Sequence, residues 1–175
     1  MELWDLYTKE REKTGKTMMR GEAVPDGYYR FVVHICIFND NGEMLIQKRQ
    51  TFKSGWSGLW DVSVGGSAIA GDTSSQAAAR ELREELGIEH SFEHICPSIT
   101  YAFKNAFDDV YIIKKNVDIT KLRLQYEEVE AVKWANADEI KRMIDSGEFI
   151  PYHKSYIDML FFRKDSIDMT VREDK

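Results

Sequence analysis

The sequence predicts an α/β fold, an α/β/α sandwich built on a mixed β-sheet. Runs of β-branched and aromatic residues recur along the chain between turn-forming residues, which is typical of strands. One amphipathic helix is predicted in the middle of these strands, and one or two more are predicted after the last of them. This order fits such a sandwich. With 175 residues, the chain is most simply one domain, over 1–175, with a single good core.

The composition is that of a globular protein with many charges, since 43% of the residues are hydrophobic and 31% are charged. The net charge is -6 and no block of Lys and Arg forms a basic stripe, which argues against a nucleic-acid duplex as partner. A phosphorylated small molecule remains compatible with this charge, because bound metal ions can supply local positive charge.

No targeting or membrane segment is evident. The N-terminus is charged and lacks an apolar core, and no apolar run approaches 18 residues, so we expect a cytoplasmic protein without a membrane partner. Cys36 and Cys96 both lie in apolar, strand-like surroundings, where we expect small buried thiols.

The first 27 residues are expected to form an N-terminal hairpin extension before a core at 28–164. Residues 2–7 alternate apolar and polar, and residues 16–20 follow the turn signal Thr14-Gly15. In the core, a central strand is expected at 31–38. The other predicted strands, the second joined to the central strand by the turn at 39–42, are 44–48, 59–64, 92–103, 110–117 and 128–134.

The helix predictions rest on apolar stripes and on residues that favour helix ends. A helix is expected at 74–86, with Ala78, Leu82 and Leu86 as its apolar stripe and Gly87 ending it. The remaining predictions are a loop at 105–109, a helix at 137–145 begun by Asn136 with Glu139 and ended by Gly147, a helix at 152–162, and a charged tail at 165–175.

Three glutamates on the middle helix stand out. Glu81 and Glu85 are four residues apart and share one helical face, with Glu84 beside them. On most Glu-rich helices such residues form a solvated face. Three like charges this close repel one another, however, so a cation is the natural partner, and carboxylate oxygens suit Mg²⁺ or Mn²⁺.

The segment 66–88 resembles the signature of a known family. Its pattern is that of the Nudix hydrolase superfamily, G-x5-E-x7-R-E-U-x-E-E-x-G-U with U aliphatic, carried here by Gly66, Arg80, Glu81, Leu82, Glu84, Glu85, Gly87 and Ile88. One position departs, because Asp72 stands where the pattern has its first Glu. The resemblance implies the Nudix-type sandwich and Mg²⁺-dependent hydrolysis of a diphosphate linkage, with Mn²⁺ as the alternative ion.

The resemblance also implies a metal site. Glu81 and Glu85 are expected to be the first ligands, and Glu84 to be the third or to act on a metal-bound water. The backbone carbonyl of Gly66, or of Gly65, is expected to add a further ligand, since glycine lets the backbone approach a ligand closely.

Two further residues complete the expected catalytic set. Arg80 is expected to pair with Asp72, one methylene shorter than the family's Glu, and to hold the loop against the helix. Glu128, just before the last strand, is expected to complete the metal site or to serve as general base. A solvated charge at a strand edge is the alternative for Glu128.

Several other side chains have both a structural and a functional reading. Aromatic residues that are either core or contacts for a base or an isoprenoid are Trp56, Tyr101, Phe103 and Phe107. His34 lies within the central strand and is expected to be a hydrogen-bonded structural residue.

Segments 41–49 and 56–60 resemble one branch of the superfamily, isopentenyl diphosphate isomerase. The residues argue against that reaction. Gly65 stands where the isomerase has its catalytic Cys, and Ser67 and Arg30 stand where it has metal-binding His residues. Without the thiol and the imidazoles, no route to protonate an alkene is evident.

We therefore expect a hydrolase of the isomerase-like branch, acting on a small-molecule diphosphate such as a nucleoside diphosphate derivative. The isomerase reaction and a non-catalytic nucleotide-binding module are the alternatives, the second motivated by Asp72. Because family members are often dimers, a homodimer that uses the N-terminal hairpin is also expected.

Overall fold

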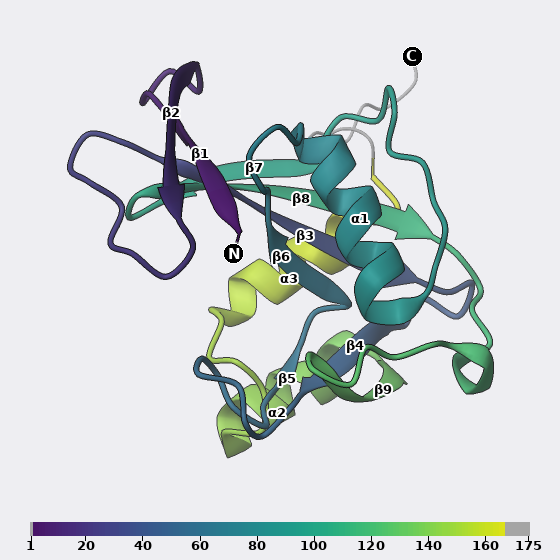
Figure 1. Cartoon of the computed structure of the whole chain (residues 1–175). Coiled ribbons are helices and arrows are strands. Elements are labelled where there is room, and N and C mark those ends of the chain that lie inside the picture. The colour runs from purple at the N-terminus through teal and green to yellow at the C-terminus, as the bar shows by residue number, and fades with distance from the viewer. Residues whose placement is uncertain (1, 167–175) are drawn as a thin grey trace, which may run out of the picture.

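The computed structural model describes residues 2–166 and has three layers (Figure 1). Helix α1 (Ser74–Leu86) packs on one face of a mixed sheet, while α2 (Ala137–Ser146) and α3 (Lys154–Arg163) pack on the other. The predicted α/β/α sandwich is therefore confirmed. The tail predicted at 165–175 falls largely at 167–175, outside the described residues.

Seven strands form the main sheet. They are β3 (Arg30–Phe38), β4 (Met44–Arg49), β5 (Trp60–Asp61), β6 (Val64–Ser67), β7 (Ile99–Phe103), β8 (Ala106–Lys114) and β9 (Val129–Ala135). The pair β3 and β8 is parallel, whereas the other pairs are antiparallel. A short 3₁₀ turn, η1 (Ile119–Lys121), precedes β9.

The sheet divides beside β3, and this division positions the site. β4 pairs with β3 only where Phe38 lies opposite Met44, and then runs alongside β9. Along the first half of β3 the neighbouring strand is β6 and not β4, with Gly65 opposite His34 and Gly66 opposite Val33. A glycine pair thus lies in the sheet directly beneath α1, which packs on both β6 and β3.

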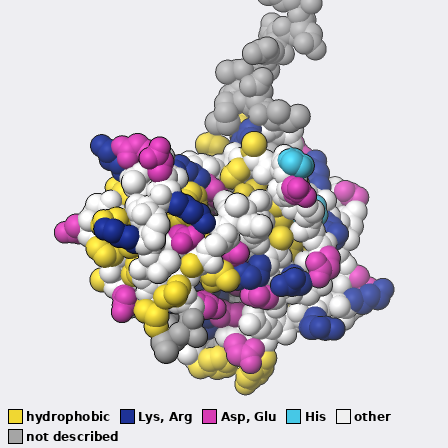
Figure 2. Space-filling model, turned by 45° about the horizontal axis from the view of Figure 1, so that its top comes forward, with side chains coloured by type: hydrophobic (Ala, Val, Ile, Leu, Met, Phe, Trp, Pro, Cys, Tyr) yellow, Lys and Arg dark blue, Asp and Glu magenta, His cyan; other side chains and the backbone are white. Residues whose placement is uncertain are grey.

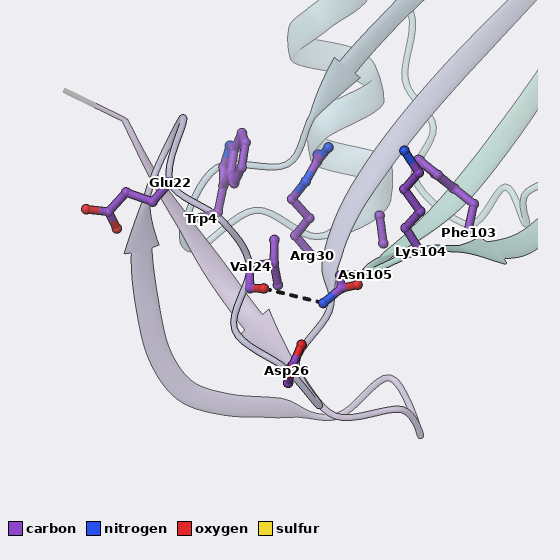
Figure 3. Close-up of a pocket in the computed structure, with 9 residues that line it drawn as sticks. Trp4, Glu22, Val24, Asp26, Arg30, Phe103, Lys104 and Asn105 are labelled. Carbon is purple, nitrogen blue, oxygen red and sulfur yellow. Dashed lines mark hydrogen bonds between the residues drawn. The ribbon is translucent and has the colours of Figure 1, made fainter.

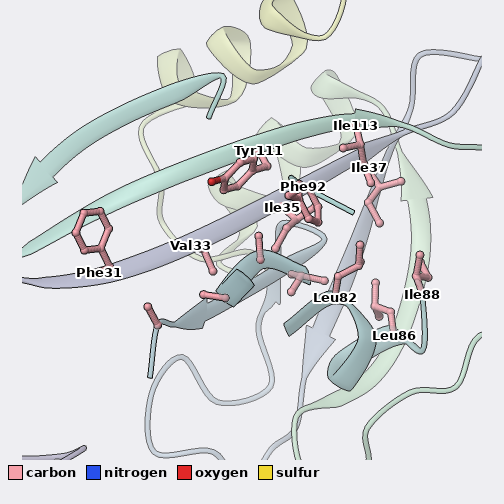
Figure 4. Packing of buried hydrophobic residues seen from close by; sticks show 14 of the residues in the cluster. Phe31, Val33, Ile35, Ile37, Leu82, Leu86, Ile88, Phe92, Tyr111 and Ile113 are labelled. Carbon is pink, nitrogen blue, oxygen red and sulfur yellow. The ribbon is translucent and has the colours of Figure 1, made fainter. Parts of the chain in front are cut away.

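The central strand β3 serves two cores because its side chains alternate between the faces of the sheet. Val33, Ile35 and Ile37 pack with Leu82 and Leu86 of α1 (Figure 4). The side chains between them face α2 and α3, where Cys36 and Phe38 pack with residues of both helices. Apart from Arg30 and His34, the strand is apolar because both of its faces are covered.

The bounds of α1 match the prediction because both ends are set by local chemistry. The Thr73 hydroxyl accepts from the Gln76 amide at 3.2 Å, and the Gln76 side chain accepts from the Thr73 amide at 2.8 Å. Gly87 ends the helix in the left-handed conformation, with φ 69°. In the same way, Asn136 caps α2 and Gly147 ends it with φ 76°.

The N-terminal hairpin consists of β1 (Leu3–Tyr7) and β2 (Lys13–Met19). Its turn lies at 8–12 and not at the predicted Thr14-Gly15, which lies inside β2. Arg11 in this turn reaches the main sheet, donating from Nη2 to both carboxylate oxygens of Asp109 at 2.8 and 2.9 Å. This pair fixes the hairpin over the start of β3.

Two strand predictions and one loop prediction were wrong in detail. The strand predicted at 59–64 is two short strands, β5 and β6, and only 99–103 of the segment 92–103 is a strand. The loop predicted at 105–109 belongs mostly to β8, and the turn before it is centred on Lys104, which has φ 46°. Consecutive aspartates usually indicate a loop, but Asp108 and Asp109 are both buried here with hydrogen-bond partners.

Two smaller findings concern the cysteines and the length of the apolar helices. Cys36 is buried as predicted, whereas Cys96 is exposed, because the segment before β7 forms turns at the surface instead of continuing the strand. Within residues 2–166, no helix is both long enough and apolar enough to cross a lipid bilayer.

The packing of α1 leads to a stability prediction. Leu82 is fully buried between α1 and β3, so Leu82→Ala should lower the free energy of unfolding by about 2–5 kcal/mol, measured by urea denaturation. Exposed Arg83→Ala on the same helix should change it by less than about 0.5 kcal/mol. Equal effects of the two changes would contradict this packing.

Candidate functional site

The four glutamates that the sequence predicted for the site line one small cavity between α1, β6 and the segment before β9. They are Glu81, Glu84 and Glu85 of α1 and Glu128. The other lining residues are Glu2, Arg20, Gly65, Gly66, Arg80 and Gln125. The structure thus brings together all the residues that the sequence predicted for catalysis and metal binding.

Arg80 ties the parts of this cavity together. Its Nε and Nη2 both donate to Oδ2 of Asp72 at 3.1 Å, and Nη2 also donates to the Ser67 carbonyl at 3.0 Å. Nη1 donates to Glu81 at 2.9 Å and to Glu84 at 3.2 Å. The expected Arg80–Asp72 pair is present, but both hydrogen bonds end on one carboxylate oxygen.

Glu85 is the most buried of the four glutamates. Its side chain lies towards the sheet and meets Gln47 of β4, whose Nε2 donates to it at 2.9 Å. Burial, then the negative charge of Glu81, raises the pKa of Glu85 well above its ordinary value. Burial also raises the pKa of Glu81, although Arg80 partly opposes this effect.

These residues suit a hard divalent cation by their chemistry. Carboxylate oxygens and backbone carbonyl oxygens are ligands that such ions prefer, and burial raises the pKa of both Glu81 and Glu85. A Cβ at Gly66 would lie 2.1 Å from Cδ of Glu81, so only glycine lets this carboxylate lie over β6. Across residues 2–166, no three acidic, His or Cys side chains already converge as a metal-binding group.

A larger cleft of about 600 Å³ adjoins the glutamate cavity, and the two share Arg20, Gly65, Gly66 and Glu128. Four basic side chains line this cleft, namely Arg20, Arg30, Arg49 and Lys53. The aromatic residues along it are Trp56, Tyr101, Phe103 and Tyr152. Phe107 belongs to the core instead, where its ring stacks on Tyr29 at 4.8 Å.

Glu128 is not a solvated strand-edge charge. It forms an ion pair with Lys53, and about a quarter of its side chain (24%) is exposed. It lies where the glutamate cavity and the cleft meet.

His34 has the hydrogen bond expected of it, and it also lines the cleft. Its Nδ1 lies 2.8 Å from Oδ2 of Asp108, which also accepts from the Tyr101 hydroxyl at 2.7 Å. Burial alone would lower the pKa of His34, but the charge of Asp108 and this hydrogen bond outweigh it, so the pKa is raised. Asp108 was missed because its partner strand lies far away in the sequence.

The positions that separate this chain from the isomerase lie together in the cleft. Arg30 Nη1 donates to the Ser67 hydroxyl at 2.8 Å, so the two positions where the isomerase has imidazoles are in contact. A Cβ at Gly65 would lie 2.8 Å from Nε2 of His34. The His34 side chain therefore occupies the space that a larger residue at position 65 would need.

The comparison with family models agrees with this geometry, since the NUDIX domain model matches residues 28–155. The chain belongs to the Nudix family. Nudix hydrolases act on small molecules that contain a diphosphate and generally use divalent metal ions. An uncharacterized Nudix hydrolase of Listeria monocytogenes is 45% identical over 166 residues, covering 95% of this chain and 97% of that protein.

Two further relatives define the place of this Nudix hydrolase. The isopentenyl-diphosphate Delta-isomerase of Shigella flexneri is 30% identical over 118 residues, covering 63% of each protein. A crystal structure of a Deinococcus radiodurans protein has a TM-score of 0.72 at 24% identity, covering 94% of this chain and 100% of that one. The first supports the likeness to the isomerase, and the second confirms the fold.

The surface carries charges of both signs. On the face shown in Figure 2, basic and acidic side chains are interspersed, without a continuous basic area. This distribution is consistent with the net charge of -6.

The burial of Glu85 predicts a pH-dependent stability. An acid with a raised pKa binds more protons in the folded state, so its contribution to the free energy of unfolding falls as pH rises between the unfolded and folded pKa values. In chelator-treated protein, Glu85→Gln should therefore raise the melting temperature at pH 8, and the gain should shrink towards pH 4. Exposed Glu89→Gln is the control, and an equal gain at both pH values would contradict the prediction.

Proposed function

We propose that this Nudix hydrolase uses Mg²⁺ to hydrolyse a diphosphate linkage in a nucleoside diphosphate derivative. One observation carries the proposal. The cavity lined by Glu81, Glu84, Glu85 and Glu128 opens into a cleft lined by basic and aromatic side chains. A diphosphate placed across the two meets carboxylates at one end and guanidinium and ammonium groups at the other.

The metal would be held by Glu81 and Glu85, with Glu84 and the backbone carbonyl of Gly66 as further ligands. When bound, Mg²⁺ supplies positive charge for phosphoryl oxygens and favours deprotonation of water, and Mn²⁺ is the alternative ion. A cation here would also lower the electrostatic cost of the buried carboxylates, whose pKa values are raised without one.

Arg80 and Glu128 have separate tasks in the proposal. Arg80 holds the Asp72 loop, the β6 backbone and two of the glutamates in fixed positions, so the carboxylates stay aligned. Glu128 accepts a proton from the attacking water or completes the metal site. Its ion pair with Lys53 holds this carboxylate between the two cavities.

The nucleoside preference rests on the aromatic residues of the cleft. Trp56 and Phe103 are 54% and 38% exposed, so their rings are accessible for stacking. Tyr101 is fixed through its hydroxyl to Asp108. Aromatic faces with nearby cations suit a base joined to phosphates.

The metal-site assignment can be tested by removing single charges. Glu84→Gln and Glu85→Gln should each lower the turnover of nucleoside diphosphate derivatives by at least about 100-fold, measured as phosphate or nucleoside monophosphate released with Mg²⁺. Glu89→Gln should leave the rate unchanged, and excess EDTA should abolish it. Full activity of either variant would reject the assignment.

The isomerase alternative can be tested directly. We expect no conversion of isopentenyl diphosphate to its isomer, because Gly65 offers no thiol and the nearby Arg30–Ser67 pair offers no imidazole. We also expect Gly65→Cys alone to remain inactive, since the new side chain meets His34. Isomer formation by the unmodified protein, followed by NMR, would overturn the hydrolase proposal.

The third reading, a non-catalytic nucleotide-binding module, predicts binding without turnover. Asp72→Glu restores the family's residue opposite Arg80. If nucleotides bind tightly but neither the unmodified protein nor Asp72→Glu hydrolyses them, the protein is a nucleotide-binding module and the hydrolase proposal is wrong.

A further inference from the structure

Arg30 has an unusual position at the start of β3. Its guanidinium carbon lies 4.4 Å from the centre of the Trp4 ring, and its Nη1 donates to the Ser67 hydroxyl at 2.8 Å. Trp4 belongs to the N-terminal hairpin, and its side chain and that of Arg30 point the same way side by side, with Phe103 beyond (Figure 3). The guanidinium is thus fixed from two sides, by an aromatic ring and by a neutral hydroxyl.

Arg30 differs from the other basic residues of the cleft in its partners. The others each have a carboxylate within 4.0 Å, in the pairs Arg20–Glu2, Arg49–Asp61 and Lys53–Glu128. Arg30 has none among residues 2–166. Burial and the nearby charge of Arg20 lower the pKa of Arg30, and the charge of Asp108 only partly opposes them, so a bound anion would stabilise the guanidinium charge.

The location of Arg30 indicates which anion. Its partner Ser67 directly follows Gly65 and Gly66, the glycines shared by the glutamate cavity and the cleft. Glu81 lies over Gly66 and His34 lies beside Gly65, and both glycines still line the two spaces. A group that begins at the glutamates and crosses the glycine pair therefore arrives beside Arg30.

We propose that Arg30 binds the second phosphoryl group of the substrate, the one that stays next to the organic moiety, while the glutamate cavity holds the phosphoryl group that water attacks. Trp4 is a positioning residue that holds the guanidinium plane towards the cleft. The inference rests on the proposed diphosphate hydrolysis, and it makes the N-terminal hairpin part of substrate recognition. It also requires a substrate whose second phosphoryl group is negatively charged.

Binding of a non-hydrolysable diphosphate tests this without turnover. Methylenediphosphonate, titrated calorimetrically into the full chain with Mg²⁺, should bind about 10-fold to 100-fold more weakly to Arg30→Met. Arg30→Lys should recover only part of the loss, because lysine lacks the planar fork. Exposed Arg142→Met is the matched control and should bind like the unmodified protein.

Kinetics separate a substrate contact from a structural role. Arg30→Met should raise KM by a similar factor while kcat changes only a few-fold. Trp4→Leu should raise KM less, and Trp4→Phe, which keeps an aromatic face, should restore it. Thermal melting establishes which variants are folded. If Trp4→Leu is unfolded, the KM values of Arg30→Met and Trp4→Phe still test the proposal.

The outcomes keep the two proposals apart. If the protein binds methylenediphosphonate through Arg30 but hydrolyses no compound, the proposed function fails and the phosphoryl site stands. If it hydrolyses a diphosphate and Arg30→Met changes neither affinity nor KM, the Arg30 site fails and the function stands. Failure of the unmodified protein to bind methylenediphosphonate would overturn the Arg30 site.

Discussion

The guanidinium of Arg80 is the contact on which the site depends. It joins a loop residue, Asp72, to the backbone of β6 at Ser67 and to two carboxylates of its own helix. Arginine suits this position because its five N–H donors lie in one rigid plane and its charge persists at any physiological pH. Without it, the carboxylates of Glu81 and Glu84 would lose the cation that contacts both of them, and the loop before α1 would lose the hydrogen bonds from Arg80 to Asp72.

Helix α1 therefore combines two opposed demands. Leu82 and Leu86 on one face stabilise the fold by burial, while Glu85 places a carboxylate in nearly the same environment at an electrostatic cost. A helix selected for stability alone would not bury that group with a single amide donor, Gln47. Such a locally unfavourable arrangement is typical of functional sites, where a bound cation can neutralise a buried carboxylate. The burial of apolar side chains in the surrounding core must offset the electrostatic cost of this carboxylate.

The parts of the protein that the sequence predicted well are those fixed by local chemistry. The ends of α1 follow from Thr73 and Gly87, and the glutamates of one helix must share a face at their spacing. What could not be predicted depends on contacts between distant segments. Asp108 looks like a loop residue until β8 pairs in parallel with β3 and places it beside His34, and no local pattern indicates that pairing.

The same reasoning explains how neighbouring branches of one family reach different chemistry on one scaffold. The positions that distinguish this chain from the isomerase are not independent, because Arg30 contacts Ser67 and Gly65 lies against His34. A thiol at position 65 would displace the imidazole, and an imidazole at position 30 would break the contacts to Ser67 and Trp4. Single reversions therefore disturb existing contacts without completing a new site, so a change of reaction requires these positions to change together.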